Sequence, residues 1–206
     1  MGKGLFVVFE GGDRVGKSTQ VRELAAWLTA SGIAHTVTHQ PGDTSAGATI
    51  RRLLLDPHSE LNDRAEALLY AADKAQHVAE VVRPALQAGQ VVICDRYVDS
   101  MLAYQGAGRD LPASELAPIV DWATGGLVPD LTVLLDIDPA RAVGRVVNKD
   151  RLEAAGDVFH RRVREGFLQL AAAEPDRYLV LPALGNLQGT ARQIREAVAE
   201  RLGERP

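Results

Sequence analysis

The feature that most constrains this chain is the octapeptide Gly11–Ser18, which matches the pattern G-x-x-x-x-G-K-[ST] in full. It directly follows the apolar run Leu5–Phe9 and leads into Lys17–Ser31, where apolar residues recur at helical spacing. A glycine-rich turn between a buried strand and a helix points successive backbone amides at an anion, and the helix adds its positive end. In this motif Lys17 reaches the β- and γ-phosphates of a nucleotide, and the Ser18 hydroxyl binds Mg²⁺. The pattern predicts nucleotide binding; the alternative is a glycine-rich turn that binds nothing.

Short apolar runs alternate along the chain with longer segments of helical spacing. We expect strands at Leu5–Phe9, His35–His39, Val91–Cys94, Leu131–Ile137 and Tyr178–Leu181. We expect helices at Lys17–Ser31, Ala46–Leu55, Asn62–Leu86 (bent or ended by Pro84), Ser114–Thr124, Ala140–Val147, Asp157–Ala172 and Thr190–Leu202, and a further one that begins near Tyr97. This alternation favours an α/β fold with a doubly wound parallel sheet. No linker or repeat interrupts it, so a single domain over residues 1–206 is predicted.

Composition narrows the range of partners and compartments. Apolar residues make up 46% of the 206 residues and charged residues 24%, which excludes wholesale disorder. The net charge of −4 gives no strong field for nucleic acid or an anionic membrane, so neither is expected as a partner. The single cysteine, Cys94, has no partner for an internal disulfide, which fits a reducing, cytoplasmic setting. We expect no secretory leader or membrane span.

A second charged pair, Asp95-Arg96, follows the run Val91–Cys94. Ligands of open α/β sheets lie beyond the carboxyl ends of the strands, so this pair is expected to face the same crevice as the phosphate loop. A carboxylate there can hold Mg²⁺ or its water, and a guanidinium is suited to a second phosphate. The alternative is a structural ion pair at a strand end.

Tyr70 and Lys74 lie four residues apart in the predicted long helix, and so on one of its faces. A ring and a cation side by side suit a nucleobase, which stacks on one and accepts a hydrogen bond from the other. An apolar stripe of Leu68, Ala72, Ala75 and Val82 lies largely on another face. Taken alone, the helix favours the alternative, an amphipathic helix with a solvated lysine.

Further candidates lie before and after these segments. A helix that begins near Tyr97 places Ser100 and Tyr104 on one face, directed at the ligand of Arg96, with Gln105 next in the chain. Arg51 is either a second clamp on the acceptor phosphate or a solvent-facing helix residue. Trp27 and Trp122 are expected to be packing residues.

Taken together, these segments resemble the thymidylate kinase family nearly from end to end. The matching stretches are FEGGDRVGKSTQ, THQPGDT, IRRLLLD, AEALLYAADKAQHV, DRYVDSMLAYQGAGR, PDLTVLLDIDP and KDRLE with the following FHRRVREGFLQLA. The resemblance implies ATP-dependent phosphorylation of thymidine monophosphate (dTMP) to the diphosphate, with Mg²⁺. It also implies a three-layer, five-stranded parallel sheet, a short lid at about residues 144–156, and a homodimer.

The resemblance also assigns roles by position. Asp13 would contact the 3′-hydroxyl region of the acceptor sugar, Arg51 and Arg96 its phosphate, Tyr70 and Lys74 its base, and Tyr104 the ribose 2′ position, with Ser100 and Gln105 in the same cleft. ATP would lie against Gly11, Gly12, Asp13, Arg14, Val15, Gly16, Lys17, Ser18, Thr19 and Arg145, and Mg²⁺ at Ser18 and Asp95. The catalytic set would be Arg14, Lys17, Asp95, Arg96 and Arg151.

Arg14 is the most informative departure within that family. Members keep the arginine that steadies the transferring phosphoryl group either in the phosphate loop or in the lid, and this chain has Arg14 in the loop. Its lid stretch, Arg145–Arg151, is shorter and less basic than the arginine-rich bacterial lid. We therefore expect Arg14 to be the main transition-state cation, with Arg151 and Lys149 secondary.

Three other departures lie on the acceptor side. Met101 occupies a position that usually holds a small polar residue, Lys74 replaces an arginine, and Gln40–Thr44 (QPGDT) differs from the commoner E-P-G-G-T. Lysine lacks the two-pronged donor geometry of arginine. These changes predict weaker discrimination among pyrimidine monophosphates. Two alternatives stay open: a nucleoside monophosphate or deoxynucleoside kinase with another acceptor, and a nucleotide-dependent switch or partition ATPase.

Overall fold

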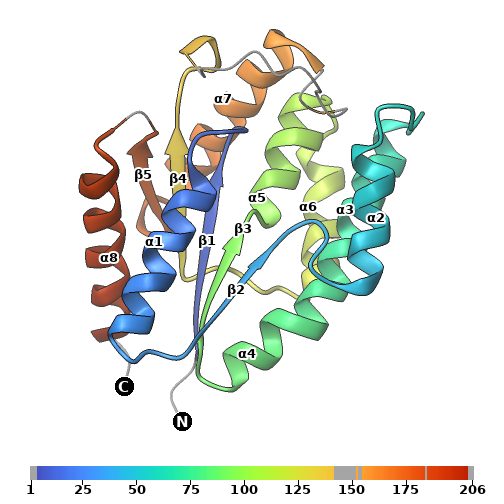
Figure 1. Ribbon diagram of the computed structural model, residues 1–206. Helices are drawn as coiled ribbons and strands as arrows, with labels where there is room; N and C mark the ends of the chain where they lie inside the picture. The colour runs from blue at the N-terminus through green and yellow to red at the C-terminus, as the bar shows by residue number, and fades with distance from the viewer. Residues whose placement is uncertain (1–3, 142–151, 153–154, 184, 204–206) are drawn as a thin grey trace.

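The computed structural model describes residues 4–141, 152, 155–183 and 185–203 (Figure 1). Its sheet has five parallel strands in the order β2-β3-β1-β4-β5. The strands are β1 (Leu5–Gly11), β2 (His35–His39), β3 (Val91–Asp95), β4 (Leu131–Asp136) and β5 (Tyr178–Pro182). Each run predicted to be a strand forms one, and the predicted parallel α/β sheet is confirmed.

The predicted helices are found at nearly the expected positions. They are α1 (Lys17–Ala30), α2 (Ser45–Leu55), α3 (Asp63–His77), α4 (Arg83–Gln87), α5 (Val98–Met101), α6 (Ala113–Thr124), α7 (Asp157–Ala173) and α8 (Leu187–Gly203). Two π-helical segments, η1 (Val78–Val82) and η2 (Leu102–Gly108), join α3 to α4 and extend α5; η3 (Pro139–Arg141) and η5 (Pro175–Arg177) are 3₁₀ turns. The helix expected over Ala140–Val147 begins within η3, and residues 142–147 lie outside the described residues.

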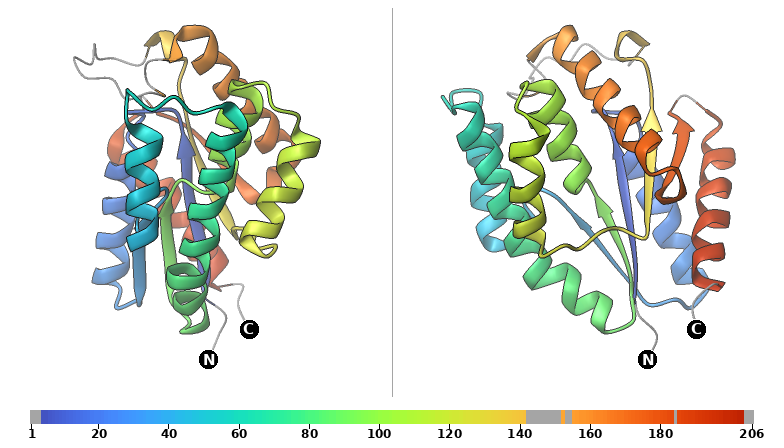
Figure 2. Two further views of the ribbon diagram at one scale, coloured as in Figure 1. Left: turned by 90° about the vertical axis from the view of Figure 1, so that its right-hand side faces the viewer. Right: turned by 180° about the vertical axis from the view of Figure 1, so that it is seen from behind.

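Helices cover the two faces of the sheet, and the pattern of β1 shows why. Leu5, Val7 and Phe9 belong to the core beneath α1 and α8, while Phe6 and Val8 belong to the core beneath η1 and α4. Successive side chains of a strand point to opposite faces, so a strand covered on both sides must be apolar throughout. The second face is completed by α5 and α7, as the view from behind shows (Figure 2). None of the helices described is long and apolar enough to cross a membrane.

The long helix predicted over Asn62–Leu86 contains a wide turn. The segments α3, η1 and α4 follow one another without a break, and Pro84 stands in the first turn of α4, directly after the π-helical segment. Proline lacks an N–H group, so the regular i to i−4 bond is lost at this residue. Pro84 neither ends the helical run nor precedes a loop, and the helical run continues to Gln87.

Two expectations about exposure are wrong. Lys74, which the helix taken alone favoured as solvated, is 2% exposed. The apolar stripe on another face is exposed only in part: Leu68 is 55% exposed and Ala72 is exposed, whereas Ala75 is half-buried and Val82 is buried. Trp122 on α6 is 84% exposed and is not a packing residue. Spacing along a helix shows which residues share a face but not which face meets the rest of the protein.

Candidate active site

A cavity of about 570 Å³ lies beside the carboxyl ends of β1, β2 and β3. It is lined by residues of the phosphate loop, of β2 and its following turn, of α2, of α3, and of β3 through η2. All eight residues predicted to bind the acceptor lie on its wall, namely Asp13, Arg51, Tyr70, Lys74, Arg96, Ser100, Tyr104 and Gln105. Arg14, Lys17, Ser18 and Asp95 line it too, so the two predicted groups of residues share one cavity.

The phosphate loop joins β1 to α1 and turns at two glycines with positive φ. Gly11 has φ 131°, and Gly16, the residue before α1, has φ 95°. L-residues with a side chain rarely adopt these angles. The Lys17 ammonium donates to the carbonyl oxygens of Gly12 at 2.6 Å and Gly11 at 3.2 Å. Burial, with the positive charge of Arg96 nearby, lowers the pKa of Lys17 to about 8. The Lys17 ammonium therefore lies against the backbone of the loop in which it is predicted to bind phosphate.

Arg14 occupies a strained position in that loop. Its φ is 62°, a left-handed conformation that costs a residue with a Cβ about 1–3 kcal/mol. The residue is exposed and lines the cavity. Strain of this kind persists only where the surroundings hold it, and here it occurs at a cationic residue on the cavity wall.

Ser18 and Asp95 come together as the sequence predicts. The Ser18 hydroxyl donates to the Asp95 Oδ2 atom at 3.0 Å, although the residues belong to α1 and to the end of β3. Both oxygens are hard ligands of the kind that Mg²⁺ binds, usually with water and substrate phosphates completing the shell. The described residues hold no cluster of three or more acidic, histidine or cysteine ligands. The pair offers two oxygen ligands that could hold a Mg²⁺ ion.

Arg96 is the most highly bonded side chain of the cavity. Its guanidinium donates to the Gly11 carbonyl at 2.9 Å, to Asp13 Oδ1 at 2.6 Å and to Ser100 Oγ at 3.0 Å. Burial opposes the charge of Arg96, but Tyr104 and Asp13 outweigh it and raise the pKa of the guanidinium. Burial likewise opposes ionisation of Asp13, and Arg96 and Lys17 lower the pKa of that carboxyl overall. The phosphate loop and the end of β3 are thus joined by an ionised pair.

Ser100 is bonded to a residue that the sequence reasoning missed. Its hydroxyl donates to Glu10 Oε2 at 2.5 Å while it accepts from Arg96. Glu10 also accepts from the backbone amides of Tyr97 at 2.8 Å and Ser100 at 3.0 Å. Burial, and then the nearby Asp99, raise the pKa of Glu10. The sequence feature that could have identified Glu10 is a carboxylate near the end of an otherwise apolar strand. The only proton of the Ser100 hydroxyl is committed to Glu10, so this residue links Arg96 to Glu10.

Tyr104 and Gln105 come from η2 and are held in different ways. The Tyr104 hydroxyl donates to Asp13 Oδ2 at 3.0 Å, and its ring lies 5.1 Å from the guanidinium carbon of Arg96. The Gln105 side-chain amide donates to the buried Glu66 at 2.7 Å. Arg109 bonds the same carboxylate at 3.2 Å. Both predicted residues reach the cavity wall, and Gln105 is positioned by a buried carboxylate on α3.

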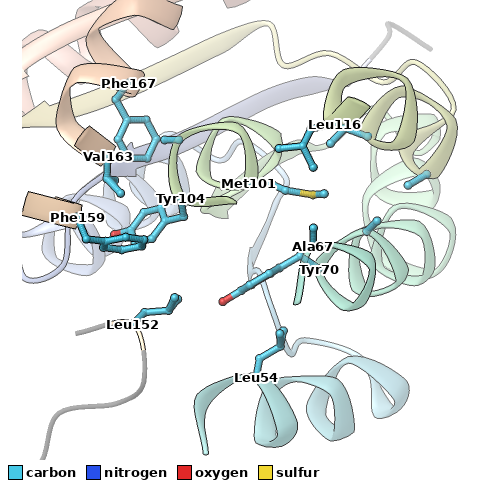
Figure 3. Packing of buried hydrophobic residues seen from close by; sticks show 14 of the residues in the cluster. Leu54, Ala67, Tyr70, Met101, Tyr104, Leu116, Leu152, Phe159, Val163 and Phe167 are labelled. Atoms are coloured by element: carbon cyan, nitrogen blue, oxygen red, sulfur yellow. The ribbon is translucent and has the colours of Figure 1, made fainter. Parts of the chain in front are cut away.

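The other end of the cavity is lined by Tyr70, Lys74, Met101 and Gln40, and we call it the base end. The buried His77 lies next to this end, with its Nδ1 atom 2.7 Å from the Gln40 amide nitrogen. The Lys74 ammonium lies 5.8 Å from the centre of the Tyr70 ring and donates to Gln40 Oε1 at 3.1 Å. The Tyr70 side chain extends from α3 into an apolar cluster that includes Met101 (Figure 3). Arg51 donates to the Pro41 carbonyl at 2.7 Å, so it faces the cavity and not the solvent alone.

Several other predicted site residues are not found on the cavity wall as described. Thr19 follows Ser18 in the first turn of α1 and accepts from the Arg22 side chain at 3.3 Å, and it is absent from the cavity wall described. Val15 is buried beneath the loop. Arg145, Lys149 and Arg151, the predicted lid cations, lie outside the described residues. The roles assigned to all these residues remain predictions.

The fold and the cavity together define a phosphate-loop α/β protein of the nucleotide kinase class. The family model for thymidylate kinase matches residues 9–194 of the chain. The chain therefore belongs to the thymidylate kinase family.

Individual relatives agree with this assignment. The chain is 59% identical over 200 residues to a thymidylate kinase of Cutibacterium acnes, covering 97% of this chain and 96% of that protein. It is 52% identical over 204 residues to one of Deinococcus radiodurans, covering 98% and 99%. The crystal structure of thymidylate kinase from Ehrlichia chaffeensis matches with a TM-score of 0.81 at 27% identity, covering 95% of this chain and 99% of that one. These matches confirm the expected ATP-dependent kinase of dTMP.

Proposed function

We propose that the cavity binds ATP at the phosphate loop and dTMP at its other side, so that the γ-phosphoryl group of ATP meets the dTMP phosphate in line. The observation that carries this proposal is that the Ser18–Asp95 pair and the Arg51, Tyr70 and Lys74 side chains line a single cavity. A protein that only hydrolyses ATP has no use for a second basic cluster beside a ring. The acceptor site is what favours a kinase over a nucleotide-dependent switch.

The chemistry requires positioning and charge neutralisation and little else. The acceptor phosphate is already ionised near neutral pH, since its second pKa is about 6, so no general base is needed. Phosphoryl transfer spreads negative charge over the equatorial oxygens, and cations around them lower the barrier. Lys17 would bind the β- and γ-phosphates. Arg96 would bind the acceptor phosphate while Asp13 and Ser100 hold its guanidinium in place.

Mg²⁺ would be held by the Ser18 hydroxyl and the Asp95 carboxylate. When bound, the ion neutralises charge on the β- and γ-phosphates. The fit rests on the two oxygens, which already lie at 3.0 Å from one another across the loop and the strand end. Arg14 would supply the further positive charge at the transferring group, with Arg151 and Lys149 secondary.

The homodimer is proposed on the exposed apolar face of α2 and α3. Leu53 is 46% exposed and Leu68 is 55% exposed, and both lie on the side of these helices away from the cavity. Leu68→Asp should shift the protein from dimer to monomer in light scattering coupled to gel filtration. Gln193→Asp, at an exposed position on α8, adds the same single negative charge and serves as the control. A wild type that elutes as a monomer at micromolar concentration would remove the proposal.

A cytoplasmic location is likewise proposed, supported by the lone buried Cys94.

One assay separates the functional alternatives. ADP release is coupled to a dehydrogenase readout and measured with dTMP, dUMP, dCMP, AMP, GMP and no acceptor. We expect dTMP-dependent release at a rate far above the rate without acceptor. Release that depends instead on another monophosphate would assign a different acceptor, and release without any acceptor would assign an ATPase.

A further inference from the structure

Five side chains form an unbranched row of hydrogen bonds from the rim of the cavity to its base end. Lys74 Nζ donates to Gln40 Oε1 at 3.1 Å, and Gln40 Nε2 lies 2.7 Å from His77 Nδ1. His77 Nε2 lies 2.5 Å from Thr38 Oγ1, which donates to Asp43 Oδ2 at 2.5 Å. Gln40, Thr38, Lys74 and His77 are buried, whereas Asp43 is exposed at the rim.

The direction of every bond in this row is set by its two ends. The Lys74 ammonium has donors only, so Gln40 must turn its oxygen to Lys74 and its amide nitrogen to His77. His77 Nδ1 therefore accepts, which requires a neutral ring with its proton on Nε2. That proton is donated to Thr38, and the Thr38 hydroxyl then donates to Asp43. Among the described residues, no side-chain atom of Gln40, His77 or Thr38 is buried without a partner.

We propose that Thr38, His77 and Asp43 are positioning residues for the acceptor base, because they hold Gln40 with its carbonyl oxygen toward Lys74. This inference rests on the proposed function, since it needs the base at Tyr70 and Lys74. With one of its N–H groups held by Gln40, the ammonium presents the other two to the cavity. Such a group accepts a base that offers a carbonyl oxygen, as thymine and uracil do at position 4, and opposes the amino group that cytosine offers there.

The reverse arrangement of Gln40 shows what the row prevents. A flipped amide would aim two N–H donors at an ammonium, and both groups would be left without an acceptor in a buried site. An unmade bond at a buried polar group costs more than the bond itself contributes. The Asp43 carboxylate accepts at the far end and cannot donate, so the row has one self-consistent orientation. Asp43, at the rim, therefore influences how Gln40 faces Lys74 through the hydrogen bonds of the row.

The test uses two valine substitutions on one strand. Thr38→Val removes the acceptor of His77, and we expect KM for dTMP to rise about threefold to tenfold. We expect kcat and KM for ATP to stay within twofold of wild type, and the ratio of kcat/KM for dTMP over dCMP to fall. Thr36→Val is the matched control, because the Thr36 hydroxyl donates to Gln90 at 2.5 Å, away from the cavity wall. Thr38→Ser retains the hydroxyl and should restore wild-type values.

A second readout does not depend on activity. In the wild type, ¹⁵N chemical shifts of the His77 ring should show a neutral ring with the proton on Nε2 at pH 7. Gln40→Glu puts acceptors opposite Nδ1, so that nitrogen should gain a proton. An Nδ1-protonated wild-type ring, or a Thr38→Val enzyme with unchanged dTMP kinetics, would overturn the inference. A wild type that fails to phosphorylate dTMP would instead overturn the proposed function, even with the expected His77 shifts.

Discussion

The two ends of the cavity hold their polar groups in opposite ways. At the phosphate end, which comprises Gly11–Ser18 with Arg96, the ionised pair of Arg96 and Asp13 joins the loop to the strand end at 2.6 Å. At the base end, Lys74 is the charged member, and it is bonded to the neutral Gln40 and His77 row. Burial lowers the pKa of Lys74, against the attraction of Asp73. Arg96, by contrast, has its pKa raised by its neighbours.

This contrast follows from what each end has to bind. The negative charge of a phosphate offsets the desolvation of cations in a partly buried site, and its oxygens accept hydrogen bonds from several directions. A pyrimidine base is neutral and is distinguished by which of its atoms donate and which accept. A row of neutral groups with one permitted orientation is suited to that distinction. The phosphate end should therefore govern rate, and the base end should govern selectivity and the response to pH.

The largest effect is expected from Arg14. Arginines that stabilise phosphoryl transfer contribute about 10³–10⁵ in rate, so Arg14→Ala should lower kcat steeply while KM for dTMP stays nearly unchanged. Arg14→Gly removes the same guanidinium and relieves the left-handed backbone at φ 62°. Both variants should lose kcat alike, while the glycine variant should be the more stable in urea. A loss of kcat below tenfold would exclude this role.

Arg96 is expected to produce the next largest effect. Arg96→Lys retains the charge and the backbone conformation but loses the fork that bonds Gly11 and Asp13. Hydrogen bonds to charged groups contribute about 1.5–3 kcal/mol, so kcat/KM for dTMP should fall about tenfold to a hundredfold. The control is Arg64→Lys, since Arg64 pairs with Glu115 at the surface. Equal values for the two variants would contradict a role for Arg96 at the acceptor.

The buried His77 beside the base end should make the free energy of unfolding depend on pH. Burial lowers the pKa of His77 from 6.5 to about 4, so between these values the unfolded chain binds a proton that the folded chain does not. The free energy of unfolding should therefore fall as pH decreases from 6.5 to 4, and His77 should contribute about 3 kcal/mol to that fall. Urea unfolding of His77→Gln should show a shallower fall than the wild type. An unchanged pH dependence in His77→Gln would contradict this expectation, and the same substitution at the exposed His58 serves as the control.

The smallest effect concerns the 5-methyl group of the base. Met101 is buried and lines the cavity where the family usually has a small polar residue, and a flexible thioether adapts to either a methyl group or a hydrogen. Two substrates that differ by one methyl group in an apolar pocket differ in kcat/KM by about tenfold at the lower limit. We expect kcat/KM for dTMP over dUMP near that limit, measured in the coupled assay. A strong preference for dTMP over dUMP would contradict this expectation. A preference for dTMP over dCMP would not, because it is attributed to Lys74 and not to Met101.

The parts of the site that were predictable are those carried by short segments. The phosphate loop needs only eight consecutive residues, and the strand ends locate Asp95 and Arg96, because parallel strands end at one edge of the sheet. Glu10 was missed since its partners, Tyr97 and Ser100, are distant in the chain. The row through Thr38 and His77 was missed for the same reason.

Local spacing and residue types in a fixed order were enough to predict the succession of strands and helices along the chain, the phosphate loop and the family. The burial of Lys74, the exposure of Leu68 on another side of α3 and the single orientation of Gln40 became evident only in the folded chain. Burial and hydrogen-bond direction are properties of what packs against a side chain. Those neighbours come from β2, from the turn after it and from α3, and folding alone brings them together.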